Sequence, residues 1–114
     1  ITTTTDKEVM AYIDKLLAGP IDPAIDYTYP AEFLYYARKE LNKALALTEK
    51  QLQAKEESWT FNLRRQIFEY LGHKDKALAE VKKAITFRKA NPLDAQNQAW
   101  ALEEWGKHLD RLRE

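Results

Sequence analysis

The sequence predicts an all-α fold, an antiparallel stack of helical hairpins in one domain spanning residues 1–114. Apolar residues recur at steps of three and four along most of the chain, which is the spacing of one face of an α-helix. No segment alternates apolar and polar residues for long enough to form a strand, and Gly-Pro, Gly and Asn-Pro steps separate the helical segments. With 114 residues, 45% of them hydrophobic, the chain is large enough to bury one core.

The N-terminal segment predicts an extended, threonine-rich lead-in at residues 1–5 and then a helix at residues 6–18. Thr5 and Glu8 have the spacing of a capping box, in which a hydroxyl and a carboxylate bond the unpaired amides of a helix start. Gly19-Pro20 ends this helix. We expect it to cap one end of the stack.

Residues 30–54 are predicted to form the first hairpin. Pro30 suits the first position of a helix, because the amide that proline lacks would be unpaired there in any case. We expect this helix to reach about Lys39 and its partner to run from about Leu41 to Ala54. Lys39 stands where a tight turn between paired helices favours glycine.

Residues 58–91 are predicted to form the second hairpin, with helices over about 59–71 and 74–90. Gly72 separates the two helices and supplies the left-handed conformation of a tight turn. Asn91-Pro92 ends the hairpin, and a last helix at residues 93–112 carries apolar residues along one stripe. We expect that helix to cap the other end of the stack.

The two hairpins share a repeated segment. Lys43 to Leu47 aligns with Lys76 to Glu80, and Ala44 and Ala77 are thirty-three residues apart, close to the 34-residue period of tetratricopeptide repeats. The second hairpin resembles that repeat at Phe61, Phe68, Gly72, Ala77, Val81 and Ala84. The resemblance implies about two repeats plus N- and C-terminal capping helices, arranged as a right-handed superhelix.

A second resemblance covers most of the chain in short segments. The chain resembles the C-terminal helical domain of a bacterial family of unknown function, the unknown-function family twenty-nine eleven, at Leu17-Ala18-Gly19-Pro20, Trp59 to Arg65, Leu71 to Lys74 and Glu103-Glu104-Trp105. Members typically carry an N-terminal β-rich domain, often behind an export signal. The resemblance therefore implies the C-terminal part of a larger, periplasmic or otherwise exported protein. The start without methionine leads us to expect a fragment of a longer chain. It implies no activity.

The composition argues against several classes of function. Eighteen Lys and Arg balance eighteen Asp and Glu, whereas a nucleic-acid-binding protein needs a basic excess to neutralise phosphates. The absence of cysteine excludes disulfides and thiolate chemistry. No apolar run approaches the roughly 20 residues that span a bilayer, so we expect no membrane insertion. The sequence also offers no glycine-rich phosphate loop and no Ser/His/Asp arrangement, so we expect neither an enzyme nor a cofactor.

Two polar features of the sequence could form a metal site or a contact for an acidic partner. Glu104 and His108 share one helix face, but helical di-metal sites need Glu-x-x-His on two helices, so we expect no metal site. Arg64 and Arg65 could serve an acidic partner. The alternative, which we favour, is that both are solvated, because adjacent helical residues point in different directions.

The candidate partner-binding residues follow from the resemblance to tetratricopeptide repeats, whose concave face is lined by the first helix of each hairpin. Aromatic and amide side chains there would hold a peptide. These residues are Tyr29, Phe33, Tyr36, Trp59, Asn62, Gln66 and Tyr70. The alternative is that most of these rings pack between helices as core.

Trp100 is a further candidate interface residue. It lies five residues before Trp105, so the two indoles cannot both face the core. We expect Trp100 to contact a further domain or a second copy of the chain, or else to cover a neighbouring helix end.

Two functions remain. The first is a non-catalytic module that binds a protein, a peptide or its own N-terminal domain, with a weak homodimer as a variant. The second is an accessory helical domain that closes over a ligand or an active site supplied by a further N-terminal domain.

Overall fold

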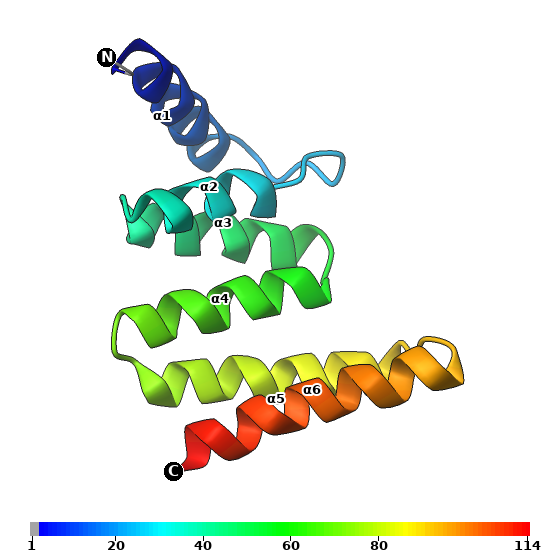
Figure 1. Cartoon of the computed structure of the whole chain (residues 1–114). Helices are drawn as coiled ribbons and strands as arrows, with labels where there is room; N and C mark the ends of the chain where they lie inside the picture. The colour runs from blue at the N-terminus through cyan, green and yellow to red at the C-terminus, as the bar shows by residue number, and fades with distance from the viewer. Residues whose placement is uncertain (1–2) are drawn as a thin grey trace. The chain divides into compact units, whose positions relative to one another are not determined.

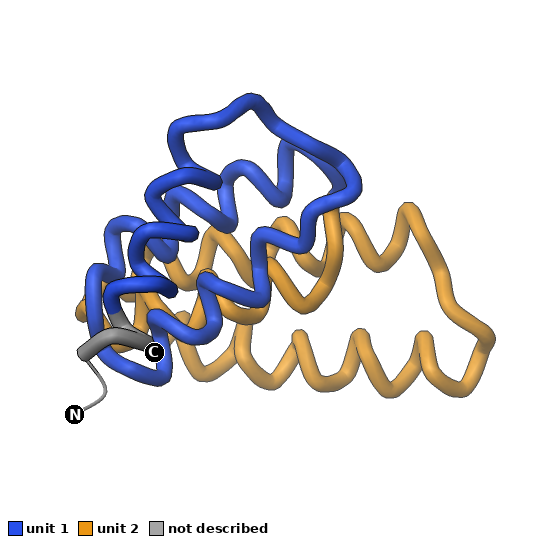
Figure 2. Tube along the Cα trace, turned by 90° about the horizontal axis from the view of Figure 1, so that it is seen from above, with its two compact units in different colours: residues 1–55 blue, residues 56–114 orange. Residues whose placement is uncertain are grey.

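The computed structural model describes residues 3–114, which confirm the all-α prediction: they form six helices and no strand (Figure 1). The helices are α1 (Thr3–Ala18), α2 (Thr28–Ala37), α3 (Leu41–Ala54), α4 (Ser58–Tyr70), α5 (Lys74–Ala90) and α6 (Ala95–Arg113). They divide into two compact units, residues 1–55 and 56–114, coloured blue and orange in Figure 2. Each unit has its own helix packing and is described by itself.

The first unit is centred on α3, against which both α1 and α2 pack. Helix α2 presents Ala31 and Leu34 to this core, and α3 presents Ala44 and Leu47; all four side chains are fully buried. Each pair is three residues apart and so lies on one helix face. Ile13 supplies the contact of α1 with the same core.

Lysines of α3 fix the position of α1. Lys43 Nζ lies 2.7 Å from Asp14 Oδ1, and Lys50 Nζ donates hydrogen bonds to the carbonyl oxygens of Leu16 and Gly19. These carbonyls belong to the C-terminal end of α1, where no intrahelical donor reaches them. A lysine on the neighbouring helix therefore caps α1.

The loop between α1 and α2 is held by buried polar groups. The Tyr27 backbone amide donates to Gln51 Oε1 at 2.9 Å, and the Tyr27 hydroxyl accepts from the Asp22 amide at 2.9 Å. Tyr27 is 1% exposed, and among the described residues of the unit it is the largest side chain that is fully buried. The start of α2 is thereby tied to α3.

The second unit is a hairpin of α4 and α5, with α6 packed against α5. Its core contains Ile67 of α4, Ala77 and Val81 of α5, and Trp105 of α6. Ala77 is fully buried, consistent with a small residue at a close approach of two helices.

The turns of the two hairpins have the same hydrogen bonds. Arg38 has φ 56°, and the amides of Arg38 and Lys39 donate to the carbonyls of Tyr35 and Leu34. Gly72 has φ 82°, and the amides of Gly72 and His73 donate to Glu69 and Phe68. Both patterns are Schellman motifs. Arg38, and not Lys39 as expected, therefore occupies the glycine position of the first hairpin, thirty-four residues before Gly72.

Three helix starts differ from the expected positions. Helix α1 begins at Thr3, so residues 3–5 are helical, and Thr5 is not the N-cap of a capping box; residues 1 and 2 lie outside the described part. Threonine is only a modestly poor helix former, which permits this early start. Helix α2 begins at Thr28 and places Pro30 in its third position, where an amide still has no intrahelical partner. Helix α6 begins at Ala95, two residues after the expected start, with Asp94 as its N-cap.

The two adjacent arginines are buried, which contradicts the expectation that they are solvated. Arg64 Nε lies 3.2 Å from Glu80 Oε1, and the Arg64 and Glu80 side chains are 7% and 3% exposed. Arg65 donates to Asn62 Oδ1 and Glu69 Oε2. Burial is possible because acceptors on α4 and α5 compensate both guanidinium charges.

Candidate functional site

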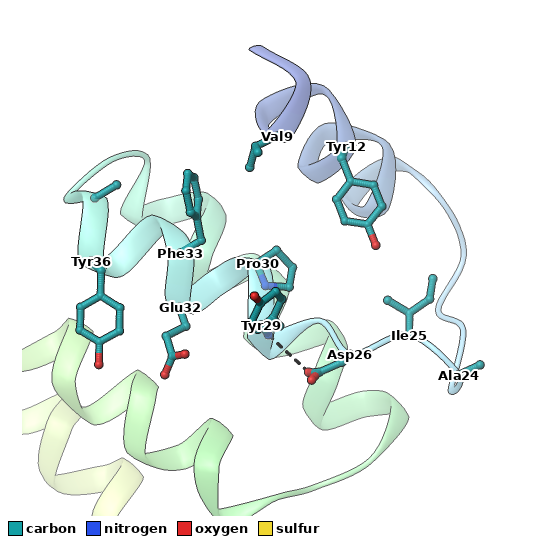
Figure 3. Close-up of a pocket in the computed structure, with 11 residues that line it drawn as sticks. Val9, Tyr12, Ala24, Ile25, Asp26, Tyr29, Pro30, Glu32, Phe33 and Tyr36 are labelled. Atoms are coloured by element: carbon teal, nitrogen blue, oxygen red, sulfur yellow. Dashed lines mark hydrogen bonds between the residues drawn. The ribbon is translucent and has the colours of Figure 1, made fainter. Parts of the chain in front are cut away.

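A groove of about 1010 Å³ lies in the first unit, between α1, the loop after it and one face of α2 (Figure 3). We call it the aromatic groove. Its lining residues are Val9, Tyr12, Ala24, Ile25, Asp26, Tyr29, Pro30, Glu32, Phe33, Tyr36 and Ala37.

Helix α2 supplies three aromatic side chains of the groove, and the sequence predicted all three as contact residues. Tyr29, Phe33 and Tyr36 are spaced by four and three residues, so they lie on one face of the helix. Ala31 and Leu34 occupy the opposite face and pack on the core. The three rings are 70%, 40% and 67% exposed and so are not core residues.

The other wall of the groove comes from residues that the sequence analysis did not single out. Val9 and Tyr12 come from α1, and Ile25 comes from the loop; Figure 3 shows Phe33 directed toward Val9 and Tyr12 directed toward Ile25. Tyr12 is 52% exposed, while its neighbour Ile13 is fully buried. The available signal was that Tyr12 falls outside the stripe of Ile13 and Leu16 that packs on the core.

Two acidic residues line the groove, and hydrogen bonds hold one of them, Asp26, in place. Asp26 and Glu32 are its only charged lining residues in the described part of the chain. Asp26 Oδ1 accepts the amides of Thr28 and Tyr29 at 3.1 and 3.3 Å, the second of which is drawn in Figure 3. These bonds cap the N-terminus of α2 and hold the carboxylate at the groove.

The candidates of the second unit are only partly brought together. Trp59, Asn62 and Trp100 line a smaller hollow of about 380 Å³ between α4 and α6, together with Leu93 and His108 among others. Gln66 and Tyr70 are not among its lining residues, although Tyr70 is 54% exposed.

The two indoles of α6 differ as expected. Trp100 is 63% exposed and Trp105 is 8% exposed, which confirms that one ring faces away from the core. Trp105 packs near His108, with ring centroids 6.0 Å apart. The exposure of Trp100 leaves its role as an interface residue a prediction.

A charge network joins α4 to α6 in the second unit. Both oxygens of Glu69 accept from Arg111, at 2.6 and 2.9 Å, and Oε2 also accepts from Arg65. The hydrogen bonds from Arg111 lower the pKa of Glu69 to about 2. Burial and the neighbouring Arg65 and Arg111 lower the pKa of His108.

Two further findings concern other kinds of site. Within residues 3–114, no three His, Cys, Asp or Glu side chains gather as metal ligands would. Glu104 pairs with Lys107, while His108 Nδ1 lies 2.9 Å from Arg111. None of the helices that the structure describes combines the length and the apolar character that crossing a membrane requires.

Comparisons of the chain with protein-family models, with curated proteins and with solved structures found no match.

Proposed function

We propose that this chain is a non-catalytic interaction module that holds a peptide or a protein segment in the aromatic groove. The observation that carries the proposal is the exposure of Tyr29, Phe33 and Tyr36 along a single face of α2, opposite Val9 and Tyr12. Exposed aromatic side chains give a large contact area at a small entropic cost and are enriched among the residues that dominate binding.

The groove also has the properties expected of a preformed site. Tyr27 and Gln51 tie the start of α2 to α3, and Lys43 and Lys50 tie α1 to the same helix. Both walls therefore rest on one element. A site whose walls are already ordered loses little conformational entropy when a ligand binds.

The hairpin turns support a relationship to tetratricopeptide repeats as part of the proposal. Arg38 and Gly72 hold the same turn position one 34-residue period apart. Ala44, Ala77 and Ala84 are fully buried, as the small residues of that repeat are expected to be. The four segments that resemble the unknown-function family twenty-nine eleven favour the same class of module.

Selection of a displayed library of linear peptides on the full chain tests the proposed function. We expect enriched peptides whose dissociation constants rise at least about tenfold in Phe33→Ala. Tyr70→Ala is the matched control, because it removes an exposed aromatic side chain that lies outside the groove. A selection without enrichment, or peptides that bind wild type and Phe33→Ala equally, would refute the proposal.

A further inference from the structure

We infer that the aromatic groove binds an amphipathic helix of a partner protein, which lies antiparallel to α2 and places a Lys or Arg of its last turn at Asp26. This inference rests on the proposed function and names the conformation and the charge of its ligand. It starts from α2, which is apolar on two opposite faces. One face packs on α3, while the face with Tyr29, Phe33 and Tyr36 is exposed. A helix that is apolar on both faces is typical of one that lies between two neighbours.

A helical ligand suits this groove better than an extended one. An extended peptide needs hydrogen-bond partners for its backbone, and it commonly obtains them from the edge of a sheet. The described residues that line the groove belong to two helices and the loop that joins them, so no strand edge is available there. A helix pairs its own amides and carbonyls, and it can therefore bury apolar side chains in the groove without leaving backbone groups unpaired.

The spacing of the three rings matches the apolar stripe of a second helix. Tyr29, Phe33 and Tyr36 are separated by four and three residues, which places them about 6 and 4.5 Å apart along the axis of α2. Apolar residues of an amphipathic helix recur at the same intervals, so they can pack between these rings when the two axes cross at about 20°. Val9 and Tyr12 of α1, also three residues apart, would contact the ligand from the opposite wall (Figure 3).

Asp26 determines the charge of the ligand. Its hydrogen bonds from the amides of Thr28 and Tyr29 both end on Oδ1, so Oδ2 retains its capacity to accept from a guanidinium or an ammonium group. The same bonds hold the carboxylate at the N-terminal end of α2, one turn beyond Tyr29. A Lys or Arg that continues the apolar stripe of the ligand by one turn would therefore meet Asp26.

The helix dipoles determine the direction of the ligand. The N-terminal end of α2 carries a partial positive charge, which favours the partially negative C-terminal end of a neighbouring helix. In this antiparallel orientation the ligand cation lies in the last turn of its own helix, where a positive side chain is stabilising. From Tyr36 through Phe33 and Tyr29 to Asp26 the steps are three, four and three residues. The ligand then has the pattern apolar-x-x-apolar-x-x-x-apolar-x-x-Lys or Arg.

Three labelled peptides test the inference by fluorescence anisotropy against the full chain. The first, acetyl-Gln-Leu-Ala-Gln-Phe-Ala-Gln-Ala-Leu-Ala-Gln-Lys-Ala-amide, has this pattern. The second exchanges the Lys with the first Gln, which moves the cation to the other end without changing the composition. The third carries Pro in place of the Ala before the second Leu, which breaks a helix. We expect the first peptide to bind about fivefold more tightly than the second and at least about tenfold more tightly than the third.

Asp26→Asn separates the charge of this residue from its capping of α2. Asparagine still accepts the amides of a helix start, so the fold is retained while the ligand cation loses its carboxylate. We expect the first and second peptides to bind Asp26→Asn alike. Asp110→Asn is the matched control, because it removes an exposed carboxylate of α6 that lies outside the groove. This control should leave the preference for the first peptide unchanged.

Four results with the peptides would overturn the inference. They are equal binding of the first and third peptides, binding of the second peptide that equals or exceeds that of the first, a preference that survives Asp26→Asn, and the absence of binding by the first peptide. A dimer in light scattering that Phe33→Ala dissociates would also overturn it, because a second copy would then be the occupant.

The library selection decides the proposed function separately. Selected peptides that require Phe33 but tolerate proline at every position, or that lack Lys and Arg, would leave the proposed function standing while the inference of a helical, cationic ligand fails.

Discussion

At the scale of single residues, the stability of the fold depends on ion pairs between side chains that are distant in the sequence. Glu80 was not singled out by the sequence, because a glutamate on a helix is usually solvated. In the structure its side chain is 3% exposed and meets Arg64, sixteen residues earlier. Spacing within one helix carries no information about a partner on another helix, which is why this pair could not be predicted.

Loss of one partner of the Arg64–Glu80 pair should be strongly destabilising. Arg64→Ala removes the buried cation beside the Glu80 carboxylate and leaves only the exposed Lys83 ammonium near it, so we expect the free energy of unfolding in urea to fall by about 3 kcal/mol. Lys83→Ala is the control: Lys83 lies 3.6 Å from Glu80 but is 59% exposed, and its loss should cost less than about 1 kcal/mol. Equal losses of unfolding free energy in Arg64→Ala and Lys83→Ala would contradict the claim that the buried Arg64–Glu80 pair stabilises the fold more than the exposed Lys83 does.

Acidic pH should lower the free energy of unfolding, because protonation of Glu69 removes a stabilising charge. Its folded-state pKa of about 2 lies below the ordinary value of 4.5, so the stabilisation is fully present above about pH 4.5 and is lost as the pH falls toward 2. We expect this contribution to be about 1 kcal/mol after solvent screening. The lowered pKa of His108 also makes the folded chain less stable in acid. This loss of stability begins as the pH falls below about 6.5, where the imidazole is protonated more readily in the unfolded chain.

Urea unfolding of wild type and Glu69→Gln between pH 7 and pH 3 measures the Glu69 contribution. The stability difference between the two proteins should shrink as the pH falls through the range between the folded and unfolded pKa values. A difference that stays constant over this range would show that the Arg111 and Arg65 contacts do not stabilise the Glu69 carboxylate.

At the scale of elements, the sequence predicted every helix, because apolar periodicity and Gly or Pro punctuation act locally. The glycine position of the first turn was misplaced by one residue, since neither Arg38 nor Lys39 carries the signal that Gly72 does. The resemblance to tetratricopeptide repeats named Tyr29, Phe33 and Tyr36, which line one wall of the groove, while their role in binding stays a prediction. The opposite wall depends on how α1 is anchored to α3 by Lys43 and Lys50, which no local pattern encodes.

The turns offer a test at this scale. Glu40 has φ 48°, a conformation that costs an L-residue about 1 kcal/mol, so Glu40→Gly should raise the melting temperature. Gly72→Ala should lower the melting temperature by a similar amount, because the φ of Gly72 is 82°. No atom within 4 Å would obstruct the added Cβ, so the backbone conformation alone causes this loss. Lys39→Gly is the control within the first turn, since Lys39 has no positive φ and glycine there should bring no gain. An increase for Lys39→Gly equal to that for Glu40→Gly would refute the argument from backbone strain.

At the scale of the whole molecule, the two units divide the aromatic residues in a way that experiments can use. All three tryptophans lie in residues 56–114, whereas five of the six tyrosines lie in residues 1–55. Tyrosine signals therefore report chiefly on the unit that contains the aromatic groove. Tyr12, Tyr29 and Tyr36 line the groove, while Tyr27 is buried in the same unit and Tyr70 belongs to the other unit.

The most direct test of the proposed function is ¹⁹F NMR of the full chain labelled with 3-fluorotyrosine and titrated with a peptide from the library selection. Single Tyr→Phe variants assign the signals. We expect the resonances of Tyr12, Tyr29 and Tyr36 to shift together with one dissociation constant, while those of Tyr27 and Tyr70 stay in place. Shifts confined to Tyr70, or binding that leaves the three groove tyrosines unchanged, would contradict the assignment of the aromatic groove as the binding site.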